Sequence, residues 1–166
     1  MKLRFVTCND PLSAMIRDRE GEATPFTPSH VEMVVAGGYL GAHYDGGVGV
    51  RPVGYDKTAL LHELFVNVPL TVPGDAAAEK YARGKIGSPY DWGAILDFVL
   101  PVNFHAENHC ICSAFMTSTL QAGGEFPYAL ARAPHATSPL DLMFWFSGRN
   151  DIGATSVYEM MSRSHG

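Results

Sequence analysis

Residues 29–43 read SHVEMVVAGGYLGAH, and this stretch sets the architecture expected for the rest of the chain. Val31 to Val35 is apolar and rich in β-branched residues, which favours a buried strand. Gly37-Gly38 favours a tight turn, so Tyr39 to His43 is interpreted as the paired strand. The stretch therefore predicts an antiparallel hairpin whose two outer ends carry histidines, His30 and His43.

Short strands on either side of the hairpin extend it into a sheet. Leu3 to Cys8 alternates apolar and polar residues, as a half-buried strand does. Val48 to Pro52 follows a glycine turn, and Leu64 to Val68 forms one more apolar segment. We interpret the set as a meander of short antiparallel strands.

Helices are expected mainly in the second half of the chain. Asp10 and Pro11 mark the start of one early, short helix. Later helices are predicted over 75–83, 89–100, 112–122 and a short segment capped by Ser138. Strands and helices thus segregate along the chain, which is typical of an α+β domain. The 166 residues suit a single domain spanning 1–166.

Charge and hydropathy exclude several classes of partner. The formal net charge is −5, and the 12 basic residues are scattered, so no nucleic-acid partner is expected. No apolar stretch approaches the roughly 18–20 residues that span a bilayer. The first residues lack the features of a signal peptide. We expect a cytoplasmic location as synthesised, with release or phage association as alternatives.

The chain has three cysteines, Cys8, Cys110 and Cys112. This low and odd number argues against a disulfide framework. Cys112 is expected in the first turn of its helix, where free N–H groups and the helix dipole lower a thiol pKa. It is the first candidate nucleophile, and a buried, inert thiol is the alternative. Cys110 is the competing nucleophile, and Cys8 is expected in the core.

His30 is the candidate base, because cysteine–histidine catalysis needs partners close in space and not in sequence. A third group should orient its imidazole. His43 is ranked first because the hairpin returns it beside His30. Glu32 is second, since it shares a strand face with His30, and Asp45, just past the strand end, is third.

The segment that leads to the cysteine helix contains residue types that can bind a metal ion. His105, His109, Cys110 and Cys112 offer nitrogen and sulfur ligands, but their spacing matches no standard zinc pairing. No metal and no other cofactor is therefore assigned.

Two segments carry a family resemblance. The residues Ser29-His30-Val31-Glu32-Met33-Val34, followed by a Gly-Gly turn, resemble the histidine strand and hairpin of NlpC-type cell-wall peptidases. Cys112-Ser113-Ala114-Phe115 resembles the cysteine motif of that superfamily, although here it follows the histidine. This reversed order is similar to the circularly permuted, YiiX-like branch, as are residues 87–92 and 137–142. The similarity covers roughly residues 12–143.

The resemblance implies a papain-like fold, in which the cysteine helix packs on an open strand array. It implies Cys112 as nucleophile and His30 as base. Relatives tend to carry a polar or acidic group near 41–43, where only His43 qualifies.

The expected function is a cysteine hydrolase that cleaves an amide bond through an acyl-enzyme. Peptidoglycan stem peptides are the leading substrate. An acyl or lipid ester or amide, hydrolysed or transferred, is second. The alternatives are a binding or assembly module, such as a phage-related protein, that has lost turnover, and a small metal-binding domain.

Overall fold

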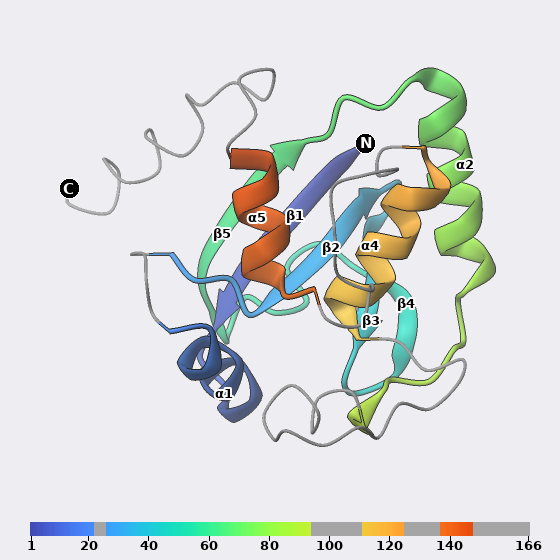
Figure 1. Cartoon of the computed structure of the whole chain (residues 1–166). Coiled ribbons are helices and arrows are strands. Elements are labelled where there is room, and N and C mark those ends of the chain that lie inside the picture. Colours follow the sequence, from blue (N-terminus) through green and yellow to red (C-terminus); the bar gives the residue numbers. More distant parts are fainter. Residues whose placement is uncertain (22–25, 94–110, 125–136, 148–166) are drawn as a thin grey trace.

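Five antiparallel strands form the sheet of the computed structural model, which describes residues 1–21, 26–93, 111–124 and 137–147 (Figure 1). In sheet order they are β4 (Gly47–Arg51), β3 (Gly38–His43), β2 (His30–Val35), β1 (Lys2–Cys8) and β5 (Leu60–Asn67). The predicted hairpin is confirmed as β2 and β3, with Val34 opposite Tyr39. Gly37, at φ 88°, provides the left-handed backbone of its turn.

The order of the strands differs from a simple meander. Strands β2, β3 and β4 follow one another, but β5 does not continue beyond β4. It pairs instead with β1, which inserts between β2 and β5 and is bonded on both sides. The N-terminal strand therefore lies near the middle of the sheet, where both of its faces are covered.

The described residues contain four long helices. They are α1 (Pro11–Glu20), α2 (Val72–Gly84), α4 (Cys112–Ala122) and α5 (Pro139–Ser147). The predicted caps are confirmed: Asp10 accepts a bond from the N–H of Ser13 at 3.0 Å, and Ser138 Oγ accepts one from the N–H of Asp141 at 3.0 Å. The predicted helix over 89–100 and the predicted loop over 101–109 lie largely or wholly outside the described residues.

Helix α2 begins earlier than its composition predicts. Thr71, and not a residue next to Asp75, is its N-cap, and the hydroxyl accepts a bond from the N–H of Gly74 at 3.2 Å. Pro73 occupies the first turn, where its missing N–H costs nothing. None of the helices in the described part of the chain has the length and apolarity needed to cross a bilayer.

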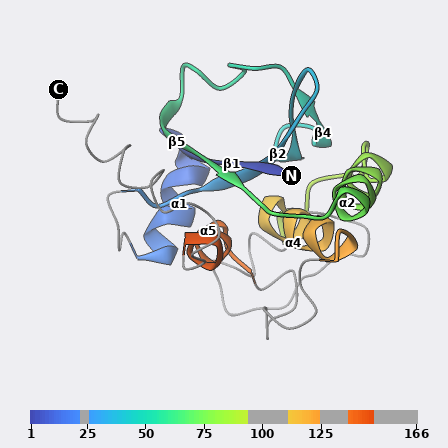
Figure 2. The same cartoon turned by 90° about the horizontal axis from the view of Figure 1, so that it is seen from above.

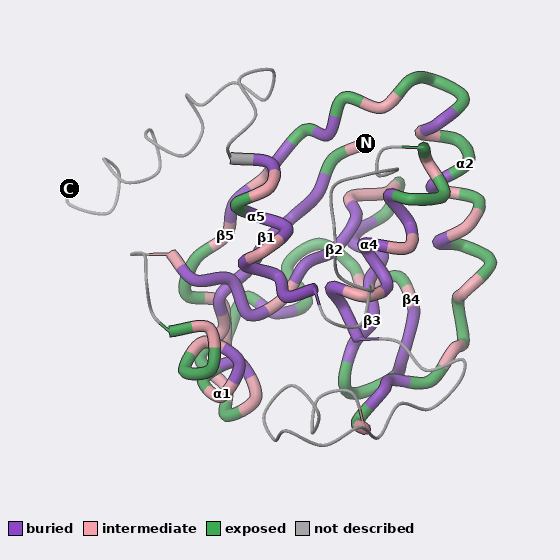
Figure 3. Tube along the Cα trace, viewed as in Figure 1, coloured by how far each residue is buried: buried purple, intermediate pink, exposed green. Residues whose placement is uncertain are grey.

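The helices lie on one side of the sheet. Helix α4 packs on β2 and β3, α1 packs on β1, and α2 and α5 both pack against α4 (Figure 2). The apolar side chains that alternate along the central strands make the shared core, including Leu3, Phe5, Val31, Met33 and Leu40. Burial is accordingly concentrated in the central strands and α4 (Figure 3).

The other side of the sheet is covered differently. The connection between β4 and β5, residues 52–59, crosses it (Figure 2). Because side chains alternate along a strand, Arg4, Glu32 and Tyr39 belong to this side, opposite the apolar core. The molecule is thus an α+β fold with one apolar and one polar buried sheet face.

Candidate active site

The candidate nucleophile begins helix α4, as the sequence predicts. Cys112 is the first residue of the helix and its side chain is buried, with 3% of it exposed. Ile111 is the N-cap and has no side chain that can bond the first-turn N–H groups. A helix leaves those N–H groups without intrahelical partners, so they remain available to an anion.

The candidate base begins strand β2. The recorded pairing between β2 and β3 in the described sheet ends at Met33 opposite Leu40. The outer ends that carry His30 and His43 therefore lie beyond the paired part. The two imidazole rings occupy this opening, with centroids 5.3 Å apart and a tilt of 44°.

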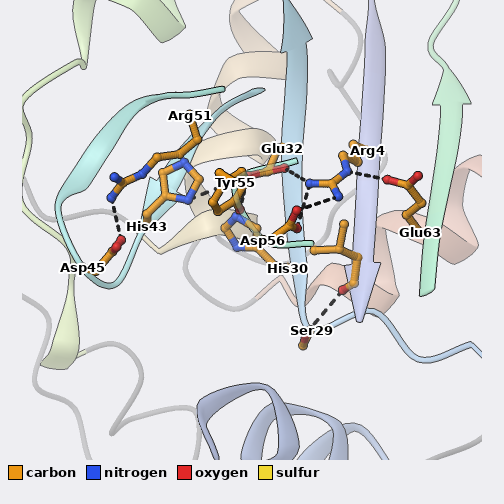
Figure 4. Close-up of polar contacts among 11 residues, drawn as sticks. Arg4, Ser29, His30, Glu32, His43, Asp45, Arg51, Tyr55, Asp56 and Glu63 are labelled. Atoms are coloured by element: carbon orange, nitrogen blue, oxygen red, sulfur yellow. Dashed lines mark hydrogen bonds and ion pairs between the residues drawn. The ribbon is translucent and has the colours of Figure 1, made fainter. Parts of the chain in front are cut away.

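The carboxylate of Glu32 lies close to both histidines (Figure 4). Its Oε1 is 3.3 Å from His30 Nε2 and 3.7 Å from His43 Nδ1. The separation of two residues puts the side chains of His30 and Glu32 on one face of β2, and the hairpin brings His43 to the same place. Glu32 is fully buried, so its carboxylate needs partners on every side.

Arg4 and Tyr55 supply those partners. Arg4 Nη1 donates to Glu32 Oε2 at 3.0 Å, and the Tyr55 hydroxyl donates to Oε1 at 2.6 Å. The same guanidinium bonds Asp56 at 3.1 Å and Glu63 at 2.8 Å (Figure 4). Arg4 itself is 1% exposed. The carboxylate is therefore held at a fixed place beside His30.

The pKa values of the site follow from burial and from these contacts. Burial alone would lower the pKa of His30, but its favourable interactions with the Cys112 sulfur and with Glu32 raise it to about 10. Burial would raise the pKa of Glu32, yet the contacts with His30 and Tyr55 lower it to about 2. Near neutral pH the arrangement therefore favours an imidazolium next to an ionised carboxylate.

His43 behaves differently from His30. Burial and, next, the neighbouring positive His30 lower its pKa to about 4. Its ring is therefore neutral when that of His30 is charged. The two histidines, with ring centroids 5.3 Å apart, thus differ in protonation, because Cys112 and Glu32 stabilise the charge of His30, and burial and that charge disfavour a second one on His43.

A cavity of about 260 Å³ opens beside the histidines. It lies between α1 and the ends of β1, β2 and β3, and its lining includes His30, His43, Tyr55 and Tyr90. Burial and the nearby Cys112 sulfur raise the pKa of Tyr90, so this ring lies at the cavity and close to the thiol. The cavity therefore adjoins the candidate base.

The structure brings together most of the predicted site. Cys112, His30, Glu32 and His43 are assembled, but Glu32, ranked below His43, makes the close polar contact with His30. Asp45 lines the cavity rim and is paired with Arg51 at 2.6 Å. Cys110, His105 and His109 lie outside the described residues, and Cys8 is only partly buried.

Sequence reasoning missed Arg4, Tyr55 and Asp56. A single charged residue between Leu3 and Phe5 is typical of a strand with one solvated face, and 52–59 has the composition of a loop. The available signal was the pair of opposite charges, Arg4 and Glu32, on neighbouring strands. That signal requires the strand order, which the sequence does not supply.

Neither the protein-family models nor the curated proteins compared with this sequence match it, so the roles of these residues rest on their geometry.

Proposed function

We propose that this protein is a thiol hydrolase of papain-like architecture that cleaves an amide bond. The observation that carries the proposal is the series of polar interactions that links Cys112 to His30 and His30 to Glu32. The thiol begins a helix without a capping side chain, and it interacts with an imidazole that a buried carboxylate holds. A nucleophile, a base and an orienting group in this order are the elements of cysteine catalysis.

Each residue has a separate task in the proposed reaction. Near neutral pH His30 already holds the proton of the Cys112 thiol as an imidazolium, and the thiolate attacks the substrate carbonyl. N–H groups at the start of α4 stabilise the resulting oxyanion. His30 returns the proton to the leaving amine, and then takes a proton from the water that hydrolyses the thioester. Hydrolysis of the thioester releases a carboxylic acid and regenerates the Cys112 thiol.

Glu32 is the orienting group in this proposal, in place of the higher-ranked His43. Its Oε1 lies 3.3 Å from His30 Nε2, which leaves Nδ1 as the nitrogen available to the thiol. A carboxylate with a pKa of about 2 stabilises the imidazolium that forms during the reaction. His43, neutral at the same pH, contributes no such charge.

The contact between Glu32 and His30 also favours a hydrolase over a binding module without turnover. A module that has lost catalysis has no need to keep a buried, ionised carboxylate beside a histidine, because such a group is costly to desolvate. Peptide amides, including peptidoglycan stem peptides, are the leading substrate class, and acyl esters are second. The cavity of about 260 Å³ is of the size that a small acyl or aminoacyl group fills.

The first test is the reactivity of the cysteines toward iodoacetamide at pH 6–7. We expect one rapidly alkylated thiol, lost in Cys112→Ala and retained in Cys110→Ala. Cys8 is the internal control, because burial raises its pKa to about 11 and keeps it protonated. Rapid labelling that survives Cys112→Ala would place the nucleophile elsewhere.

The second test separates the orienting residues. Acylation of Cys112 by an activated ester is compared in wild type, Glu32→Gln, His43→Gln and Asp45→Asn. We expect Glu32→Gln to slow acylation by roughly tenfold or more, since it removes the charge that holds His30. A larger loss in His43→Gln or Asp45→Asn would transfer the orienting role to that residue.

A further inference from the structure

The histidines and the carboxylate of the site also have the composition of a metal-ion site. One ligand atom from each of His30, Glu32 and His43 lies within 4.8 Å of the other two. Two imidazoles and one carboxylate are a common ligand set for zinc. His30 and Glu32 lie where β2 pairs with β1, and His43 lies where β3 pairs with β4, so strand pairing holds all three more rigidly than a loop would.

The distance between Glu32 and His30 fits two ligands of a tetrahedral ion. With zinc–ligand bonds of 2.0–2.1 Å, two ligands at the tetrahedral angle are about 3.3–3.4 Å apart. Glu32 Oε1 is 3.3 Å from His30 Nε2 and 3.7 Å from His43 Nδ1. Glu32 Oε1 and His30 Nε2 are therefore already at the spacing of two zinc ligands, and the His43 ligand atom, within 4.8 Å of both, must move closer to complete the set.

Gly41 leaves the space that an ion needs. A Cβ built at Gly41 would lie 3.2 Å from Glu32 Cγ, 3.4 Å from His43 Nε2 and 3.5 Å from His30 Nε2. The missing side chain thus leaves room at the point where the three residues converge. Alanine at this position would place a methyl group in that space.

A buried nitrogen of His43 is an independent sign of a missing partner. His43 Nε2 is buried and has no hydrogen-bond partner among the described residues. His43 as a whole is only 4% exposed, and this nitrogen lies beside the space left by Gly41. Buried polar atoms are nearly always paired, so the unpartnered nitrogen points to a ligand in that space.

The surrounding charges and hydrogen bonds are compatible with a cation. The single guanidinium of Arg4 faces three carboxylates, those of Glu32, Asp56 and Glu63, so the polar face has an excess of negative charge. Arg4 and Tyr55 also fix the orientation of the Glu32 carboxylate. Ligand carboxylates in metal sites are held by such outer contacts.

We infer that His30, Glu32 and His43 form a reversible site for one divalent transition-metal ion, of which Zn²⁺ is the representative. Binding releases the proton of His30 Nε2 to solvent, and the ion takes the nitrogen and the carboxylate oxygen that orient the base. The metal-bound form is therefore inactive. This last consequence, but not the binding, rests on the proposed function.

The test is equilibrium binding of Zn²⁺ to the full chain after treatment with a chelator, read by competition with a chromophoric zinc indicator. We expect one equivalent per chain, with affinity reduced at least about tenfold in His43→Gln and in Gly41→Ala. His62→Gln, a substitution of an exposed histidine on β5, is the matched control and should bind as wild type does. Cys112→Ser should also retain binding.

A second measurement, the thermal midpoint with and without Zn²⁺, distinguishes loss of the metal site from misfolding of a variant. Zn²⁺ should raise the thermal midpoint of wild type and Cys112→Ser, and this rise should disappear in His43→Gln. Absence of binding in wild type, binding unchanged in His43→Gln, or binding lost in Cys112→Ser or in His105→Ala/His109→Ala would each overturn the site.

The two proposals fail in different ways. If Cys112 is unreactive in the metal-free chain while zinc binds as described, the hydrolase proposal is wrong and the metal site stands. The metal-free chain should hydrolyse an activated ester, and one equivalent of bound Zn²⁺ should abolish that activity. If bound Zn²⁺ leaves the activity unchanged, the inference that the metal-bound form is inactive is wrong.

Discussion

The two faces of the sheet are both buried, but they are stabilised by different interactions. On the helix side, Leu3, Phe5, Val31, Met33 and Leu40 pack against α4 and α5. On the other side, Arg4 and Glu32 stand on the same strands and form an ion-pair network beneath the 52–59 connection. The stability of the helix-side face depends on shape and buried apolar area. The stability of the other face depends on the presence of every charged partner.

This difference explains why the candidate site lies where it does. An apolar face tolerates a change of side chain if volume is conserved, but it cannot hold a charged imidazole. The polar face keeps Glu32 ionised with a pKa of about 2, and the carboxylate in turn keeps His30 protonated. His30 lies at the end of β2, from where it also interacts with Cys112 on the helix side of the sheet.

The largest effect is expected from Arg4→Met. The substitution conserves an unbranched side chain but leaves the buried carboxylates of Glu32 and Asp56 without their cation. Removing one partner of a buried ionic network costs roughly 3–5 kcal/mol. Chemical denaturation measures this loss, and a cost below about 1 kcal/mol would show that the polar face does not depend on the network.

The matched substitution on the apolar face is Leu40→Ala. Leu40 is fully buried, and its truncation should cost roughly 2–5 kcal/mol through lost burial and the cavity left behind. Unlike Arg4→Met, it should leave the pH dependence of Cys112 alkylation unchanged. A shifted pH profile in Leu40→Ala would mean that the two faces are coupled more strongly than their contacts indicate.

Three groups of the polar face should contribute to the dependence of stability on pH. The pKa of His43 is lowered from 6.5 to about 4. Its contribution to the free energy of unfolding is therefore present above pH 6.5 and is lost as pH falls through 4. Glu32 adds a loss between 4.5 and about 2. His30 has a raised pKa, so its contribution is present below 6.5 and is lost as pH rises through about 10.

The contribution of the polar face to the free energy of unfolding should therefore be highest near pH 6.5 and fall on both sides. Burial raises the pKa of Glu20 to about 7, so this residue adds a contribution that is lost as pH rises from 4.5 to 7. Denaturation series across pH 3–10 measure this profile. Relative to wild type, His43→Gln should lose the stability gained between pH 4 and 6.5, while the decline on the alkaline side remains. If the pH dependence of the free energy of unfolding below pH 6.5 is the same in His43→Gln as in wild type, groups other than His43 cause it.

The smallest effect is expected for an exposed ion pair. Arg83 and Glu79 are one helical turn apart on α2, and both side chains are 44% exposed. Such pairs contribute about 0.3–0.5 kcal/mol, because solvent and salt screen them. Glu79→Gln should therefore change the denaturation midpoint only slightly, and a loss near that of Arg4→Met would contradict the distinction between buried and exposed charges.

The local elements were largely predictable. Cys112–Ala122 forms the helix expected over those residues, and Asp10 and Ser138 cap helices as their sequences indicate. The hairpin of β2 and β3 follows from a β-branched strand and two glycines. These features depend on interactions between neighbours in the chain, and local sequence carries that information.

The pairing of distant segments was not predictable in the same way. The expected meander places β5 beside β4, whereas β5 pairs with β1. Nothing local distinguishes these two partners, because both expose an equivalent edge. The burial of Arg4 follows from this strand order, and so do its contacts with Asp56 and Glu63.

The sequence by itself determined the candidate thiol, the candidate base and the hairpin that places Glu32 and His43 near His30. It did not determine which of those two side chains makes the polar contact with His30. Alternation along β2 puts Glu32 on the correct face, but its position and charge depend on Arg4 and Tyr55, 28 and 23 residues away in the chain. Only the tertiary structure brings those partners together, because a buried carboxylate acquires its geometry and pKa from groups that are distant in sequence.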